Sequence, residues 1–196
     1  MKINPIKLNG PWKDGYAIDR HTVSSTYLGD DEWGRPHFDT TRSDIGELVY
    51  QFKYNGNNSA LSDIINLITP FLEVSWKIHK LVDIIIPIPP SNENRQYQPV
   101  VELSKAIGHK LQMPVDLGIL RKTKNEQLKG LILEDKQKAI ADSFRISGNY
   151  KSKVNVLLVD DLYDSGCTLE AATRLLQEQD KIVNVYVLTM TKTRSR

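Results

Sequence analysis

The stretch Val156–Thr168, VLLVDDLYDSGCT, joins a continuous apolar run to two adjacent acids and a turn of small residues. An unbroken run of Val and Leu predicts a strand that is covered on both faces, as in a parallel sheet. Ser165 and Gly166 then predict a tight turn into a helix. Asp160 and Asp161 therefore lie where the chain leaves the sheet. In open parallel sheets, this is the edge at which ligands bind.

The turn after the acids has the properties of an anion-binding loop. The helix that follows, expected from Thr168 to about Gln179, presents unpaired backbone N–H groups at its amino end, and its dipole favours negative charge there. Gly166 lets the backbone approach the anion closely, and the hydroxyls of Ser165 and Thr168 add donors. Two acids beside an anion are unfavourable unless the ligand offers them hydroxyls or a hydroxyl-bound metal. A ribose 5-phosphate meets both demands.

A simpler explanation exists for a lone pair of acids, which often only cap a helix or bind water in a turn. Here the complete order of strand, acids, loop and helix favours a ligand site.

The rest of the chain alternates between apolar runs and amphipathic segments. Strands that alternate with helices predict an α/β fold, with an open, mostly parallel sheet that is flanked by helices. Residues 1–40 are polar, and we expect them to form a small hairpin-like extension to a main domain over 41–196. The expected elements of the main domain are helices over 43–52, 61–68 (interrupted at Pro70, with a continuation to Ile78 as one option), 99–111, 136–141 and 168–179, and strands over 82–91, 115–120, 144–147, 154–160 and 181–190.

Composition limits the class of protein. A chain of 196 residues with 40% hydrophobic residues supports one sizeable core, and its apolar runs are too short to span a bilayer. The amino terminus lacks the apolar core of a signal peptide, and Cys167, the single cysteine, cannot form an internal disulfide. We therefore expect a cytoplasmic protein. Its oligomeric state is left open, with a homodimer as one option.

The net charge of +2 is too small to indicate nucleic acid by itself. Six basic residues gather between Arg121 and Lys138, and the chain ends in TKTRSR. Each basic segment has a simple alternative as a solvated loop or a frayed tail.

The stretch VLLVDDLYDSGCT resembles the phosphoribosyl-pyrophosphate signature of type I phosphoribosyltransferases. The resemblance implies that Mg²⁺ is held by oxygens of the substrate, with no metal ligand supplied by the protein. It also implies an acidic pair that binds ribose and a loop that binds the 5-phosphate. The substrate-binding residues implied in this stretch are Asp160, Asp161, Asp164, Ser165, Gly166, Cys167 and Thr168.

Further segments resemble the competence-associated ComF family, in order along roughly residues 40–194. They are IGELVYQFKYNGN, VDIIIPIPPSNENRQYQPVVELSKAI, RKTKNEQLKGL with the later IADSF, and VYVLTMTKT. Members of that family usually carry an amino-terminal zinc site built from cysteines, which a chain with one cysteine cannot form. Asp164 stands where Thr is common, and an Asp there is similar to the proposed proton acceptor of 6-oxopurine phosphoribosyltransferases.

Two more segments are expected to surround the leaving diphosphate, which needs cations and N–H donors. The turn PIPPSNENR supplies N–H groups with Ser91 and Arg95, although its prolines are also typical of an edge strand. The segment from Arg121 to Lys129 occupies the place of the flexible hood loop of the fold. Closing it would bring Arg121, Lys122 or Lys124 over the diphosphate and exclude water.

Three functions remain as hypotheses. The first is a transferase that moves ribose 5-phosphate from phosphoribosyl pyrophosphate to an unidentified nitrogen nucleophile, with Asp164, Arg121, Lys122 and Lys124 as candidate catalytic residues. The second is a non-catalytic ComF-type accessory protein that binds phosphoribosyl or nucleotide ligands and single-stranded DNA. The third is a 6-oxopurine salvage enzyme, which rests on Asp164 alone.

Overall fold

A computed structural model describes residues 1–54, 58–90, 97–123 and 143–193 of the chain. A five-stranded sheet forms its centre, in the order β1-β2-β9-β8-β5. Three neighbouring pairs of strands are parallel, and β1 alone is antiparallel to its neighbour β2. The strands of this sheet are β1 (Ile6–Lys7), β2 (Asp14–Arg20), β5 (Ile84–Pro87), β8 (Val154–Tyr163) and β9 (Ile182–Lys192). The prediction of an open, mostly parallel sheet is confirmed.

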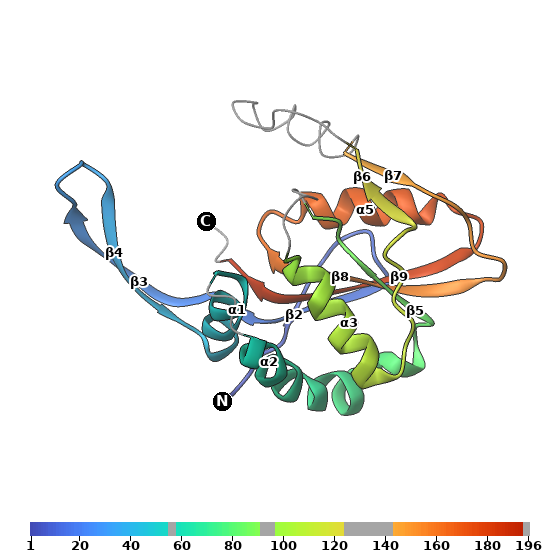
Figure 1. Ribbon diagram of the computed structural model, residues 1–196, viewed down its shortest axis with the longest axis horizontal. Coiled ribbons are helices and arrows are strands. Elements are labelled where there is room, and N and C mark those ends of the chain that lie inside the picture. Colours follow the sequence, from blue (N-terminus) through green and yellow to red (C-terminus); the bar gives the residue numbers. More distant parts are fainter. Residues whose placement is uncertain (55–57, 91–96, 124–142, 194–196) are drawn as a thin grey trace.

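Helices cover both faces of this sheet (Figure 1), with α5 (Cys167–Gln177) on one face and α1, α2 and α3 on the other. The side chains of β8 alternate between the two resulting cores. Leu157 and Val159 belong to the core under α1, α2 and α3, whereas Val156 and Leu158 pack with α5. Burial on both faces explains why this strand shows no polar alternation. The three helices of the first face are α1 (Asp44–Tyr54), α2 (Asn58–Pro70) and α3 (Pro99–Leu111).

Helix α1 is fixed at its amino end against the junction of β2 and the next strand. The Ser43 hydroxyl accepts a hydrogen bond from the Gly46 N–H at 3.0 Å and donates one to the carbonyl of Arg20. Gly46 packs so closely on the His21 carbonyl that a Cβ would clash with it. The apolar positions of α1, including Leu48 and Phe52, are buried in the core.

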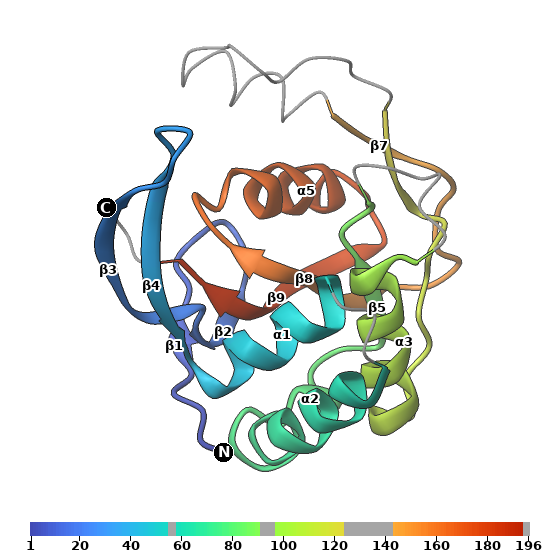
Figure 2. The same cartoon turned by 60° about the vertical axis from the view of Figure 1, so that its left-hand side comes forward.

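The first 42 residues are divided between the sheet and a projecting hairpin. We expected a hairpin-like extension over 1–40, and β3 (Thr22–Asp30) and β4 (Pro36–Arg42) do form an antiparallel hairpin that extends away from the body (Figures 1 and 2). However, β2 lies inside the central sheet, where it pairs in parallel with β9. Its residues Ala17 and Ile18 face the two opposite cores and are both fully buried, and this burial helps to hold the strand in the sheet.

The remaining elements differ from expectation mainly at their ends. Beyond Pro70 the chain stays helical, in agreement with the option of a continuation towards Ile78. A π-helical turn (η1, Phe71–Ser75) follows α2 directly, and a short 3₁₀ turn (η2, Ile78–Lys80) comes next. In place of a strand over 115–120, Val115 makes one bridge to Ile85, and β6 (Leu120–Lys122) pairs with β7 (Phe144–Ile146). The helix expected over 136–141 lies outside the described residues. In the described part of the chain, no helix combines the length and the apolar content that a membrane span requires.

We predict that Gly46→Ala destabilises the protein although Ala favours helix formation. The added Cβ has to displace the His21 carbonyl, and such overpacking lowers the free energy of unfolding by about 1–3 kcal/mol. Urea denaturation measures this loss. Ser62→Ala, at an exposed position of α2, is the control and should change stability by less than about 0.5 kcal/mol. Equal stability of Gly46→Ala and the unmodified protein would contradict the close docking of α1.

Candidate ligand site at the carboxyl edge of the sheet

A cavity of about 390 Å³ opens at the carboxyl ends of β5 and β8. Four of its lining residues are charged, two acids from the end of β8 and two lysines from other elements. Pro89 and Pro90, after β5, form another part of the wall. The complete lining is Lys53, Ile88, Pro89, Pro90, Gln98, Pro99, Val100, Val101, Lys122, Asp160, Asp161, Leu162 and Thr168.

The adjacent acids differ in their surroundings. The Asp160 side chain accepts a hydrogen bond from the backbone N–H of Asp161 at 2.8 Å. Asp161 forms an ion pair with Lys53, with 2.6 Å between its Oδ2 and the lysine Nζ. Burial alone would lower the pKa of Lys53, but the Asp161 carboxylate outweighs burial and the pKa is raised. Lys53 is therefore a cation at neutral pH.

Asp160 has an unusual protonation equilibrium. Burial raises its pKa to about 7, and the neighbouring charge of Asp161 adds to the increase. The N–H of Asp161 and the ammonium groups of Lys53 and Lys122 oppose it. At neutral pH Asp160 is therefore partly protonated, and the arrival of a hydroxyl donor or a cation would favour its ionised form.

Two of the three predicted hood cations lie in the described residues, and they face different spaces. Lys122, in β6, lines the main cavity beside Asp160, and burial lowers its pKa while Asp160 opposes this effect. Arg121 lines a neighbouring hollow of about 160 Å³ that it shares with Pro89 and Pro90. Lys124, together with Ser91 and Arg95 of the predicted diphosphate turn, lies outside the described residues.

The predicted phosphate loop forms a second, smaller pocket of about 60 Å³ at the amino end of α5. It shares Asp160, Leu162 and Thr168 with the main cavity, so the two spaces adjoin at the acids. Strand β8, which precedes this loop, ends at Tyr163 and not at Asp160 as expected, because it keeps its pairing with β9 over these three further residues. The remaining lining residues of the small pocket are Tyr163, Asp164, Ser165, Gly166 and Leu169.

Gly166 is required by the geometry of this loop. It has φ +86°, in the left-handed region, and directly precedes α5. A Cβ at this position would lie 2.5 Å from the Tyr163 hydroxyl and 2.8 Å from its ring. That ring in turn packs edge-on against Trp12, with 6.4 Å between the ring centroids. Trp12 thus supports the loop from the core.

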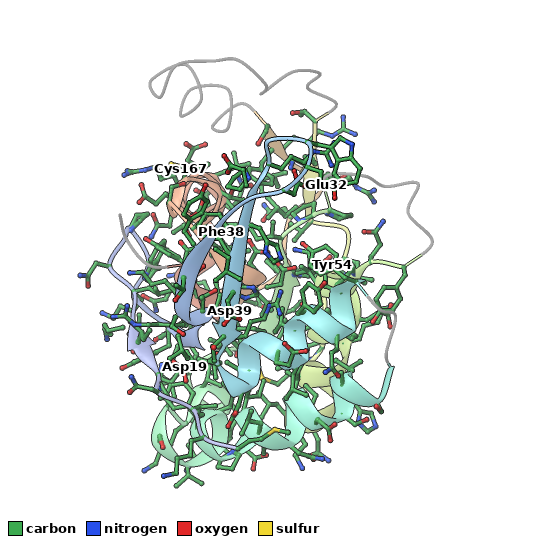
Figure 3. The ribbon with its side chains drawn as sticks, turned by 90° about the vertical axis from the view of Figure 1, so that its left-hand side faces the viewer. Asp19, Glu32, Phe38, Asp39, Tyr54 and Cys167 are labelled. Atoms are coloured by element: carbon green, nitrogen blue, oxygen red, sulfur yellow. The ribbon has the colours of Figure 1, made fainter. Side chains whose placement is uncertain are left out.

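The two remaining residues that were predicted for the phosphate loop are Asp164, near its start, and Cys167, at its end. Asp164 accepts a hydrogen bond from the Thr193 hydroxyl at 2.8 Å, which ties the loop to the end of β9. Cys167 is the first residue of α5 and is half-buried, and its backbone N–H lies 3.5 Å from the Ser165 hydroxyl that accepts its hydrogen bond. Figure 3 shows Cys167 at the start of α5, on the side of the molecule that carries the hairpin.

The sequence analysis did not predict Lys53 as a site residue. It lies in the last turn of α1, directly after the core residue Phe52. It lines the cavity because α1 points its carboxyl end towards the acids, and this direction depends on tertiary packing. The only signal in the sequence was its place in the segment IGELVYQFKYNGN, which had been used for the family resemblance alone.

Comparison with known proteins gives matches in structure alone. The adenine phosphoribosyltransferase of Trypanosoma brucei, in complex with AMP, pyrophosphate and ribose-5-phosphate, is similar with a TM-score of 0.48 and 10% identity, over 98% of this chain and 87% of that chain. Orotate phosphoribosyltransferase from Aeropyrum pernix is similar with a TM-score of 0.46 and 13% identity, over 88% of this chain and 76% of that chain. Adenine phosphoribosyltransferase from Saccharomyces cerevisiae is similar with a TM-score of 0.46 and 15% identity, over 86% of this chain and 85% of that chain. No protein-family model and no curated protein sequence matches the chain. The functional argument therefore rests on the site itself.

We predict that Asp160→Asn becomes more stabilising, relative to the unmodified protein, as the pH rises. The pKa of Asp160 is about 7 in the folded protein against 3.8 for an ordinary Asp. The folded state therefore holds this proton more tightly, and the contribution of Asp160 to stability falls as the pH rises from about 4 to about 7. An amide has no proton to lose. Melting temperatures at pH 5 and pH 8 test this, and a constant difference between the two proteins would show that Asp160 titrates normally.

We predict that Gly166→Val distorts the phosphate loop. The branched side chain is strained at φ +86° and collides with Tyr163, so that the loop has to move and the small pocket closes. Affinity for ribose 5-phosphate, measured by calorimetry, should fall at least about tenfold, as for the loss of one charge-assisted hydrogen bond. Gly148→Val is the control, because Gly148 also has positive φ but has open space around it. Unchanged affinity in Gly166→Val would place the phosphate elsewhere.

Proposed function

We propose that this chain is a phosphoribosyltransferase that binds phosphoribosyl pyrophosphate across the two adjoining pockets. The observation that carries the proposal is the acidic pair at their junction, with an anion loop on one side and a cavity lined by Lys53 and Lys122 on the other. Ribose hydroxyls match the acids, the 5-phosphate matches the helix end, and the diphosphate matches the lysines.

The reaction would transfer the ribose 5-phosphate group to nitrogen. The nitrogen nucleophile attacks C1 of the ribose while the bond from C1 to the diphosphate oxygen breaks, and pyrophosphate leaves with the bonding electrons. Positive charge develops on the sugar, next to Asp160 and Asp161, and negative charge develops on the leaving group, next to the lysines. The nucleophile must also lose a proton, for which Asp164 is the candidate acceptor.

Mg²⁺ fits the donors of this site. Among the described residues, no cluster of three or more His, Cys, Asp or Glu side chains has the arrangement of a protein-held metal site. The two carboxylates are hard oxygen donors, which suit Mg²⁺ that reaches the site on oxygens of the substrate. When bound, the ion would neutralise charge on the diphosphate.

Within this class, we propose a ComF-like protein without a cysteine zinc site, from the sequence segments described above. Its acceptor is an unidentified nitrogen nucleophile. Release of pyrophosphate with hypoxanthine or guanine would identify a 6-oxopurine acceptor, and Asp164 is the only residue that favours this alternative. The accessory function predicts no pyrophosphate release but a gel shift with single-stranded DNA that weakens steeply with salt.

We predict that Asp161→Asn weakens binding of phosphoribosyl pyrophosphate with Mg²⁺ by about 1–3 kcal/mol, the range for a hydrogen bond to a charged group. Titration calorimetry measures the affinity, and the melting temperature shows whether the fold is kept. Asp63→Asn, on the exposed face of α2, is the matched control and should bind normally. No heat with the unmodified protein at millimolar ligand would refute the proposed function. A large drop in melting temperature for Asp161→Asn would give the acid a structural role.

A further inference from the structure

The ion pair between Lys53 and Asp161 occupies the position at which a substrate hydroxyl would meet the acid. The Asp161 side chain is 14% exposed and the Lys53 side chain 28% exposed, so the pair is largely shielded from water. A ribose that reaches this carboxylate has to compete with the Nζ at 2.6 Å. A ribose hydroxyl that binds this same oxygen, Oδ2, displaces Lys53, whereas Oδ1 can accept a hydroxyl with the ion pair intact.

The cavity shows where the displaced ammonium group would go. Lys53 lines the main cavity, together with Lys122 and the first residues of α3, and it is absent from the lining of the small phosphate-loop pocket. The lysine side chain is a flexible four-carbon stem that can turn its charge without any movement of the backbone. A group bound beside Pro89, Pro90 and the start of α3 is thus within the same cavity as Lys53.

Electrostatics gives the displacement a cause. The charged residues of the cavity lining, as far as the structure describes it, are Asp160, Asp161, Lys53 and Lys122. The lysines offset the two acids when no ligand is present. A diphosphate adds several negative charges, while hydroxyls and their bound metal satisfy Asp161, so that both changes favour transfer of the ammonium from the acid to the diphosphate.

We propose that Lys53 is a substrate-binding residue that holds Asp161 in the free protein and transfers its ion pair to the diphosphate when phosphoribosyl pyrophosphate binds. The inference rests on the proposed function and adds to it a residue of α1, Lys53, that binds the diphosphate. A bound diphosphate then reaches the carboxyl end of α1, in addition to the segments predicted from the sequence to hold it.

A purely structural role for Lys53 makes a different forecast. If Lys53 only neutralises and orients Asp161, its loss harms every ligand that uses this acid, including ribose 5-phosphate. If Lys53 transfers to the diphosphate, its loss harms ligands that carry a diphosphate, whereas ribose 5-phosphate binds at least as tightly as before because it no longer competes with an ion pair.

The test compares Lys53→Met and Lys53→Arg with the unmodified full chain. Three probes are titrated by calorimetry in the presence of Mg²⁺, namely phosphoribosyl pyrophosphate, inorganic pyrophosphate and ribose 5-phosphate. Lys53→Met should bind the first two about 10-fold to 100-fold more weakly, the range for one charge-assisted hydrogen bond, and ribose 5-phosphate at least as tightly as the unmodified protein. Lys53→Arg keeps the charge and should recover most of the pyrophosphate affinity. Lys105→Met, which removes an exposed lysine from its pair with Glu102 on α3, is the control for loss of charge.

The outcomes separate this inference from the proposed function. Failure of the unmodified protein to bind either sugar phosphate refutes the function. Normal binding of phosphoribosyl pyrophosphate by Lys53→Met, or a loss confined to ribose 5-phosphate, refutes the transfer and leaves the function standing. An equal loss for all three probes also refutes the transfer. Should Lys53→Met fail to fold, Lys53→Gln replaces it in the same titrations. Weaker pyrophosphate binding with undiminished ribose 5-phosphate binding then supports a direct contact, and equal losses for all three probes overturn it.

Discussion

Two neighbouring carboxylates at the end of a buried strand repel each other and lose hydration, and the rest of the site compensates for them. Asp160 takes a hydrogen bond from the backbone and tends to keep its proton, whereas Asp161 has the ammonium of Lys53. Buried ionic and protonated pairs of this kind often contribute no more stability than apolar residues of similar volume. A ligand would offset this cost, and α1 and β6, which are placed by their own packing and pairing, bring Lys53 and Lys122 to the cavity that the acids line.

The local parts of this arrangement were predictable from the sequence. An unbroken apolar run such as Val156–Val159 requires cover on both faces, and the structure provides it with α1, α2 and α3 on one side and α5 on the other. Gly166 was expected for close approach of the backbone, and the structure shows a left-handed residue beneath which Tyr163 leaves no space for a side chain. Such features depend on neighbours within a few residues, and their physical causes can be recognised in the sequence.

The parts that depend on distant neighbours were not predictable in the same way. β2 has few apolar residues, and its place in the sheet is decided by pairing with β9 at the other end of the chain. Lys53 reaches the acids only because Ser43 and Gly46 fix the start of α1. Lys122 is an intermediate case. The sequence indicated it only as one of three hood cations. In β6 it alternates with exposed Arg121 and lies on the same side as buried Leu120, and this brings it to the cavity.

The distribution of charge also limits where a nucleic-acid partner would bind if the accessory function were correct. The tip of the β3–β4 hairpin is acidic, with Asp30, Asp31 and Glu32 in a row, and Figure 3 shows Glu32 near that tip. Phosphates would be repelled there, although the exposed Trp33 beside these acids offers a ring for stacking. Lys53 is paired with Asp161 and Lys122 lines the same cavity as Asp160, and a nucleic-acid strand would compete with the diphosphate for these lysines. Binding of single-stranded DNA through this cavity and binding of phosphoribosyl pyrophosphate would therefore exclude each other, whereas DNA held by basic residues away from the cavity would leave sugar-phosphate binding unchanged.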